Sequence, residues 1–272
     1  MPSLKLSKAL TIAGFDPSGG AGVLADVRTF AAFGFEAAAV ITSITFQNAR
    51  NVFGAEHQPG GTVRAQVMPL LEDSRIVCSK TGMLPTRELV LEVARLFRET
   101  DLPRPIVDPV LQSSSGQPLM EEDALAALIE ELLPLAQLIT PNIPEAETLA
   151  GIAITTEAEM RQAAVLIREK GAAAVLIKGG HLRGQEAGGR RQEAGQNATD
   201  ESNEAIDVLD NRGNVTVFRE PRVTSGELHG SGCILSAAIA AGLGKGMTLE
   251  DAVGKAKGFV LEAIRNALPM SR

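Results

Sequence analysis

The sequence has 272 residues, of which 44% are hydrophobic, so the chain can bury one large core and we expect a single domain over residues 1–272. The formal net charge is −7, and this acidic balance argues against binding to nucleic acid or to an anionic membrane surface. The two cysteines, Cys78 and Cys233, form no C-x-x-C motif, and no segment approaches 18 consecutive apolar residues. We therefore expect a cytoplasmic protein with reduced thiols.

Short segments rich in Ala, Val and Ile alternate with helical patterns along the chain, which is typical of α/β proteins with a mostly parallel sheet. The first helical pattern repeats apolar residues from Val23 to Ala31. It ends before Gly34, where a glycine can adopt the left-handed conformation that closes a helix. The expected buried strands are residues 9–13, 37–42, 75–79, 105–107, 138–140 and 173–178.

A small flap is expected near residues 48–58. Residues 51–58 alternate weakly between apolar and polar side chains, which predicts a short exposed strand pair inserted after the second main strand. The helix expected over residues 62–71 is interrupted by Pro69, because proline removes a backbone donor and clashes with the preceding turn.

A polar segment precedes a predicted hairpin in the second half of the chain. Residues 183–204 contain almost no large apolar side chain and cannot offset the entropy of ordering by burial, so we expect a flexible loop. Residues 205–210 and 215–220 then flank the turn-forming residues 211–214 (Asn-Arg-Gly-Asn), which predicts a β-hairpin.

The sharpest motif is HGSGC at residues 229–233, which opens directly into a helical pattern of small residues over 234–241. Gly230 and Gly232 would let the backbone approach a phosphate closely, and the free N–H groups and dipole of a helix N-terminus attract negative charge. An ordinary glycine loop with a buried cysteine explains the same residues, so the motif alone leaves its function open.

A second glycine-rich segment, AGFDPSGGAG at residues 13–22, follows a predicted strand and opens a predicted helix. Ligand-binding loops occupy this position in doubly wound sheets. The segment matches neither the GxGxxG dinucleotide motif nor the GxxxxGK P-loop. We therefore expect its glycines to let a substrate lie against the backbone.

Seven ordered segments resemble the ribokinase-like superfamily and, within it, the hydroxymethylpyrimidine/phosphomethylpyrimidine kinase family of thiamin biosynthesis. They are AGFDPSGGAGVLADVRTF, VITSITFQN, KTGML, VDPVLQSSSG, LITPNIPEAETL, VLIKGGH and HGSGCILSAAIAA, between residues 13 and 241. The resemblance implies a three-layer α/β sandwich with helices on both faces of a mostly parallel sheet. It also implies ATP as the phosphoryl donor, Mg²⁺ as the metal ion, and a homodimer in which the flap is a candidate contact.

The resemblance assigns the substrate ring to Gln47, whose amide can donate to a ring nitrogen while accepting from an amino group. A strand-end side chain that caps a loop is the alternative role for this residue. Gly14, Ala21, Asp26 and Met83 are the other expected members of the substrate pocket, although a methionine such as Met83 is more often part of a core.

Cys233 falls where sugar kinases of the superfamily carry a catalytic aspartate, so the resemblance places its thiol beside the substrate hydroxyl. At a helix N-terminus the pKa of a thiol should fall. Phosphoryl transfer depends mostly on positioning and charge neutralisation. We therefore expect Cys233, with Gly230 and Gly232, to act through position rather than basicity.

On the nucleotide side, the resemblance implies that Lys178 neutralises phosphate charge and that Asp108, Asn142 and Ser231 lie near the nucleotide. Asp108 and Glu145 are the expected metal residues, since Mg²⁺ prefers hard oxygen ligands. The spacing Asn142-x-x-Glu145 is equally that of a helix capping pair.

Two other functions stay open. Pyridoxal or pyridoxine kinases of the wider family share the GxGC loop and take a similar hydroxymethyl heteroaromatic substrate, although Gln47 favours an aminopyrimidine. A nucleotide-binding homologue without turnover is the other alternative, and Cys233, Lys178 and Glu145 argue against it. The resemblance also implies a second phosphorylation, of the monophosphate to the pyrophosphate, in the same site.

Overall fold

The computed structural model describes residues 6–48, 51–113, 116–180, 204–221 and 229–267. Within them, one nine-stranded sheet has the strand order β3-β2-β1-β4-β5-β6-β7-β8-β9. The strands are β1 (Leu6–Phe15), β2 (Glu36–Gln47), β3 (Val52–His57), β4 (Ser74–Thr81), β5 (Ile106–Val107), β6 (Leu138–Ile139), β7 (Ala174–Gly179), β8 (Glu204–Asn211) and β9 (Asn214–Pro221).

The central part of the sheet is parallel, from β2 through β1, β4, β5 and β6 to β7. The outer strands β3, β8 and β9 pair antiparallel with their neighbours. Each buried strand expected from the sequence overlaps a strand of the structure, with bounds that differ by one residue or more. The predicted mostly parallel α/β sheet is therefore confirmed.

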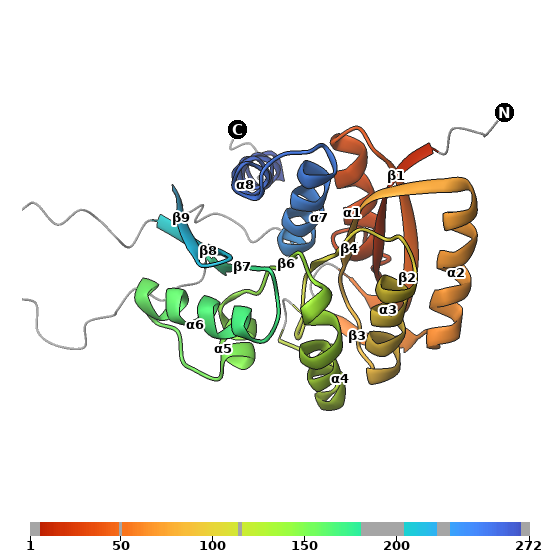
Figure 1. Ribbon diagram of the computed structural model, residues 1–272, viewed down its shortest axis with the longest axis horizontal. Helices are drawn as coiled ribbons and strands as arrows, with labels where there is room; N and C mark the ends of the chain where they lie inside the picture. The colour runs from red at the N-terminus through yellow and green to blue at the C-terminus, as the bar shows by residue number, and fades with distance from the viewer. Residues whose placement is uncertain (1–5, 49–50, 114–115, 181–203, 222–228, 268–272) are drawn as a thin grey trace, which may run out of the picture.

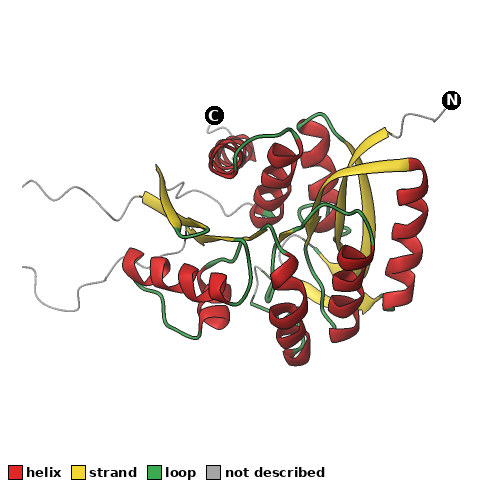
Figure 2. Ribbon diagram, viewed as in Figure 1, coloured by secondary structure: helices red, strands yellow, loops and turns green. Residues whose placement is uncertain are grey.

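Helices cover both faces of the sheet, and alternate side chains of β1 enter two separate cores. Leu10 and Ile12 belong to the larger core, whereas Ala9 belongs to the second. Figure 1 shows α1, α7 and α8 on one side of the sheet and α3 to α6 on the other, and Figure 2 shows the same layers by element type, which confirms the three-layer sandwich. The helices are α1 (Gly22–Ala32), α2 (Gly60–Asp73), α3 (Arg87–Glu99), α4 (Glu122–Ala127), α5 (Ile143–Ala150), α6 (Glu157–Glu169), α7 (Ser231–Gly244) and α8 (Leu249–Ala267), with short η1 (Leu128–Leu132) and η2 (Leu133–Leu135) after α4.

The first helix, α1, forms and ends as predicted. Its apolar residues Val23 and Phe30 are buried, and Phe30 belongs to the second core. Gly34 has a φ of +77° and its N–H donates to the carbonyl of Ala31 at 2.8 Å. The chain therefore reverses cleanly into β2.

The predicted interruption at Pro69 is wrong, because α2 continues through it to Asp73. Proline removes the donor to the carbonyl of Ala65, and both residues lie on the exposed face of the helix. Water can therefore satisfy that carbonyl, and the buried residues Val63 and Val67 hold the helix on the sheet.

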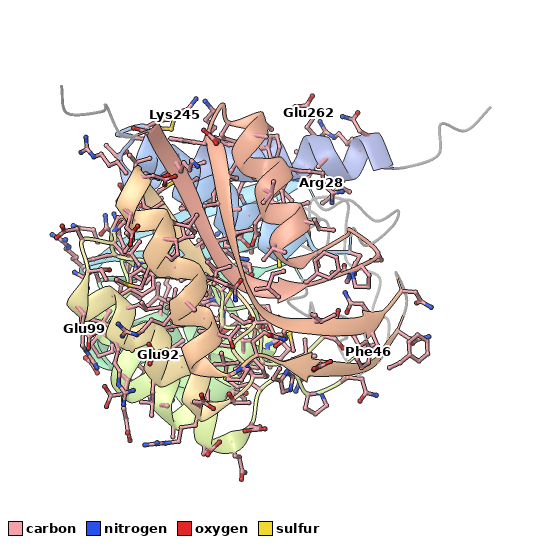
Figure 3. All side chains as sticks on the ribbon, turned by 90° about the vertical axis from the view of Figure 1, so that its right-hand side faces the viewer. Arg28, Phe46, Glu92, Glu99, Lys245 and Glu262 are labelled. Carbon is pink, nitrogen blue, oxygen red and sulfur yellow. The ribbon has the colours of Figure 1, made fainter. Side chains whose placement is uncertain are left out.

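The predicted flap is also different in form, because it contains one strand rather than a strand pair. Strand β2 continues beyond residue 42 to Gln47, and β3 pairs antiparallel with this extension from Ser43 opposite His57 to Gln47 opposite Val52. The weak alternation of the flap belongs to a single strand whose partner is β2. Figure 3 shows Phe46 at the surface of this hairpin, where its side chain is 52% exposed.

The hairpin of β8 and β9 is confirmed. Asn211 pairs with Asn214, and both Arg212 and Gly213 have positive φ, as a tight two-residue turn requires. Of the flexible loop expected over residues 183–204, residues 183–203 lie outside the described residues, and Glu204 already begins β8. No helix in the described part of the chain combines the length and apolar character needed to cross a membrane.

Candidate active site

The carboxyl ends of the parallel strands bring most of the predicted site residues to one edge of the sheet. Ligands bind at this edge in doubly wound sheets. Gly14 lies near the end of β1, Gln47 ends β2, Asp108 follows β5, Asn142 follows β6, and Lys178 lies near the end of β7.

Two glycine segments pack backbone to backbone beside this edge. Gly230, at the N-terminus of α7, has a φ of +81°, and a Cβ there would lie 2.0 Å from the carbonyl oxygen of Gly20. A Cβ on Gly20 would in turn lie 2.3 Å from Cδ2 of His229. Because larger residues do not fit, the loop after β1 fixes the position of the α7 N-terminus, whose first N–H groups have no partner within the helix.

Lys178 lies between this helix N-terminus and Asp108. Its Nζ is 3.3 Å from Oδ1 of Asp108, and its side chain is 17% exposed. A Cβ on Gly232 would lie 3.2 Å from the same Nζ. The glycine therefore leaves room for a lysine next to the positive end of α7, and the two positive features favour an anion at this point.

The charge of Lys178 shifts the pKa values of the nearby Asp108 and Glu145 carboxylates toward their charged forms, and their charges do the same for Lys178. Burial alone would lower the pKa of Lys178, but the carboxylates of Asp108 and Glu145 outweigh it and raise that pKa. Burial would raise the pKa of Asp108, but Lys178 and Lys80 keep it below its usual value. Burial does raise the pKa of Glu145, which Lys178 offsets only in part. Lys178 and Asp108 are therefore both ionised at neutral pH.

Asn142 and Glu145 form the capping box that was the alternative to a metal role. The Asn142 side chain accepts from the N–H of Glu145 at 2.9 Å, and Oε2 of Glu145 accepts from the N–H of Asn142 at 2.8 Å. The backbone of Lys178 is fixed beside them, because its N–H donates to Pro141 at 2.9 Å. The capping box therefore places the Glu145 carboxylate close to Lys178 without excluding a second role for it.

Cys233 occupies the first turn of α7, as predicted, but the expected fall in its pKa is wrong. Burial raises the pKa of the Cys233 thiol to about 11, and the nearby charge of Lys80 offsets this only in part. Desolvation of the thiolate outweighs the helix dipole at this position. The thiol is therefore protonated at neutral pH.

Asp26 lies beneath the site and has no exposed surface. Its carboxylate accepts from Thr11 Oγ1 at 2.6 Å and pairs with Lys80 Nζ at 2.9 Å and 3.0 Å. Sequence reasoning missed Lys80, although a lysine inside an otherwise buried strand is itself a signal. This buried pair supports the floor of the site, and the place of Asp26 in the substrate pocket stays a prediction.

Gly14 and Met83 lie together on the substrate side. A Cβ on Gly14 would lie 3.1 Å from Sδ of Met83, whose carbonyl accepts from Thr42 Oγ1 at 2.7 Å. Met83 is 7% exposed and borders a cavity of ≈ 340 Å³ that β3 and residues 117–121 also line.

Asp16 is a central residue of the site that sequence reasoning did not single out. Its carboxylate accepts from Ser18 N at 2.8 Å, Ser18 Oγ at 3.0 Å and Ala21 N at 2.9 Å, and it lies 3.0 Å from His229 Nε2. The Gln47 side chain is also hydrogen-bonded to it. Burial would raise the pKa of Asp16, but these donors outweigh it and lower the pKa to about 2.

The Cys233 thiol is protonated at neutral pH and is therefore a weak nucleophile for covalent catalysis. The site instead holds fixed positive features and carboxylates at the edge of a parallel sheet, which suits transfer of a phosphoryl group between bound substrates. With helices on both faces of that sheet, the molecule is a kinase of the ribokinase-like class.

Comparison with known proteins identifies the family. The family model for phosphomethylpyrimidine kinase matches residues 16–272. The hydroxymethylpyrimidine/phosphomethylpyrimidine kinase of Rhizobium meliloti is 43% identical over 260 residues, which cover 95% of this chain and 91% of that protein. The chain belongs to the phosphomethylpyrimidine kinase family.

Two solved structures show how far the likeness extends. The phosphomethylpyrimidine kinase of Clostridium difficile 630 has a TM-score of 0.79 and 36% identity, covering 96% of this chain and 100% of that chain. A Bacillus subtilis pyridoxal kinase solved as an ADP complex has a TM-score of 0.82 and 33% identity, covering 98% of this chain and 94% of that chain. Fold similarity therefore does not separate the two substrate classes.

Proposed function

We propose that the chain transfers the γ-phosphoryl group of ATP to the hydroxymethyl group of 4-amino-5-hydroxymethyl-2-methylpyrimidine, and then phosphorylates the monophosphate, in thiamin biosynthesis. The observation that carries this proposal is the convergence of Lys178 and the α7 N-terminus, with Gly232 leaving the space between them. Family membership supplies the pyrimidine alcohol as the acceptor.

The chain's own residues act by holding the reacting groups. Lys178 and the N–H groups at Ser231 and Gly232 stabilise the negative charge that develops on the transferred group. Cys233 is expected beside the substrate hydroxyl as a protonated thiol that fixes position. Because phosphoryl transfer needs little covalent assistance, this arrangement suffices without a strong base.

Asp108 and Glu145 fit a role in holding Mg²⁺, because both supply hard carboxylate oxygens next to Lys178. No group of three or more His, Cys, Asp or Glu residues gathers for a metal ion in the described part of the chain. The remaining ligands would therefore be phosphate oxygens and water, and Asn142 would lie nearby on the nucleotide side. When bound, the ion would neutralise phosphate charge during transfer.

The test compares two alcohols with the same protein. ADP release with ATP and 4-amino-5-hydroxymethyl-2-methylpyrimidine should give a kcat/KM well above that with pyridoxal. A preference for pyridoxal would establish the second candidate, which the likeness to the Bacillus subtilis pyridoxal kinase favours. ADP release with neither alcohol would support the non-catalytic alternative.

The quaternary structure is a second part of the proposal. We expect a homodimer in which the β2–β3 hairpin lies at the contact, because Phe46 and Phe53 are 52% and 72% exposed there. Exposed apolar side chains gathered on one element indicate a surface that a partner covers.

A further inference from the structure

The Asp16 carboxylate is surrounded by hydrogen-bond donors. Its Oδ1 accepts from Ser18 N, and its Oδ2 accepts from Ala21 N and Ser18 Oγ and lies 3.0 Å from His229 Nε2. The residue is 2% exposed, so little water competes for these oxygens. Asp16 is thus held in one orientation by both glycine segments of the site.

The end of β2 is fixed over this carboxylate. Thr45 Oγ1 donates to the carbonyl of Phe15 at 2.9 Å, which ties β2 to the residue before Asp16. Gln47 lies two positions further along the same strand, just past an irregularity in the pairing of β2 with β3, and its side chain is hydrogen-bonded to Asp16. The amide of Gln47 therefore has a defined neighbour on one side.

The Asp16 carboxylate determines whether the NH₂ group or the oxygen of the Gln47 amide faces it. An ionised carboxylate only accepts hydrogen bonds, whereas an amide has a donating NH₂ and an accepting oxygen. Gln47 must present its NH₂ group to Asp16, because its oxygen would be repelled there. The amide oxygen is then left to accept a hydrogen bond from a ligand.

We propose that Asp16 is a positioning residue that determines specificity by orienting the Gln47 amide. In this orientation the site selects a heteroaromatic alcohol with a ring amino group over one with a hydrogen-bond acceptor at the same position. The inference deepens the proposed function and rests on it. An amino group donates to the free Gln47 oxygen, whereas a carbonyl or phenolate oxygen would face it acceptor to acceptor.

A matched pair of ligands tests this selectivity directly. The aminopyrimidine alcohol and its 4-oxo analogue differ only where the amino group is replaced by a carbonyl, which also moves a proton onto the adjacent ring nitrogen. The wild-type protein should favour the amino compound by roughly 10²-fold or more in kcat/KM, because a mismatch leaves polar groups unpaired. Equal kcat/KM for the two ligands in the wild type would overturn the inference while leaving the proposed function intact.

Variants then separate orientation from structural support. An amide at position 16 can donate as well as accept, so Asp16→Asn should lower the preference for the amino ligand by roughly tenfold or more. Ser18→Ala is the matched control, because it removes one donor to the same carboxylate and leaves Gln47 its partner. It should keep the wild-type preference, with thermal melting confirming that both variants fold.

A double variant provides rescue. In Asp16→Asn combined with Gln47→Glu, the new carboxylate accepts from the new amide and keeps an oxygen for the ligand, so the preference for the amino compound should return. An equal fall in kcat/KM for both ligands in Asp16→Asn, without change in their ratio, would show a purely structural role and overturn the inference. Turnover of neither ligand by the wild type would overturn the proposed function, and this inference with it.

Discussion

Lys178 is the cation best placed to receive the charge of a transferred phosphoryl group, because its ammonium lies beside both Asp108 and the α7 N-terminus. We expect Lys178→Ala to lower kcat by roughly 10²- to 10³-fold and to change the KM for the pyrimidine by less than about threefold. Steady-state kinetics measures both, with Lys170→Ala at the exposed end of α6 as the control. A loss confined to KM would assign Lys178 to substrate binding instead.

Position and basicity can be separated at Cys233. With a thiol pKa of about 11, little thiolate is present at neutral pH, so Cys233→Ser should cost about tenfold or less in kcat. Gly232→Val should be far more damaging, because a Cβ there would lie 3.2 Å from Lys178 Nζ and larger atoms would displace the lysine. A serine variant that is almost inactive but binds both substrates normally would show that the thiol acts as a base.

Asp16 should make stability depend on acid. Its folded pKa of about 2 lies below the ordinary value of 3.8, so its contribution is fully present above about pH 5 and is lost as the pH falls through 2. The loss should be at most about 2.4 kcal/mol in the free energy of unfolding. The free energy of unfolding, measured with denaturant at several pH values, should fall less steeply at acid pH for Asp16→Asn than for Asp123→Asn. The second variant is the control, because it changes an exposed carboxylate of α4. The same pH dependence of the free energy of unfolding in both variants would contradict the lowered pKa of Asp16.

Residues within glycine-rich or strand-end motifs were found from the sequence, whereas the pairings between residues on distant segments were missed. Cys233 and Gly232 were found because a glycine loop before a small-residue helix has a chemical reason of its own. Asp16 and His229 are separated by 213 positions, and Asp26 and Lys80 by 54. No periodicity within a segment encodes such pairs, so only the folded sheet edge shows them.

Among the elements, the parallel strands were the most predictable, because burial on both faces gives each a short continuous apolar run. Local features at the surface were less so. The end of β2 was placed too early, since the alternating residues beyond Thr42 indicate a strand without naming its partner. The apparent break at Pro69 failed because an exposed carbonyl can be hydrated, which propensity alone does not reveal.

The same proline gives a test at the level of one helix. Pro69→Ala restores a donor to the Ala65 carbonyl inside α2 and should raise the free energy of unfolding by about 1 kcal/mol or more. Part of the gain from the restored hydrogen bond is offset, because alanine leaves the unfolded chain more conformational entropy than proline does. Pro144→Ala is the control, because Pro144 lies in the first turn of α5, where no intrahelical donor is needed. Chemical denaturation measures both, and an equal gain at the two sites would contradict this account.

At the scale of the whole molecule, the β2–β3 hairpin leaves large apolar side chains uncovered by the rest of the sandwich. It carries Ile44, Phe46 and Phe53, at 40%, 52% and 72% exposure, which are three of the five large apolar side chains recorded as exposed among the described residues. Figure 3 shows Phe46 away from the helices that cover the sheet. The hairpin also places β3 at the sheet edge, where unpaired backbone groups favour a further strand or chain.

We therefore expect the wild-type chain to sediment as a dimer and a Phe46→Asp, Phe53→Asp double variant to sediment as a monomer at the same concentration. Two charges at the contact would have to lose their hydration without partners, which costs several kcal/mol and outweighs the apolar area that remains. Val215→Asp, on the outer strand β9 at 37% exposure, is the matched control and should leave the dimer intact. A wild-type monomer would contradict the proposed homodimer, and a dimer that survives the double variant would place its contact on another face of the molecule.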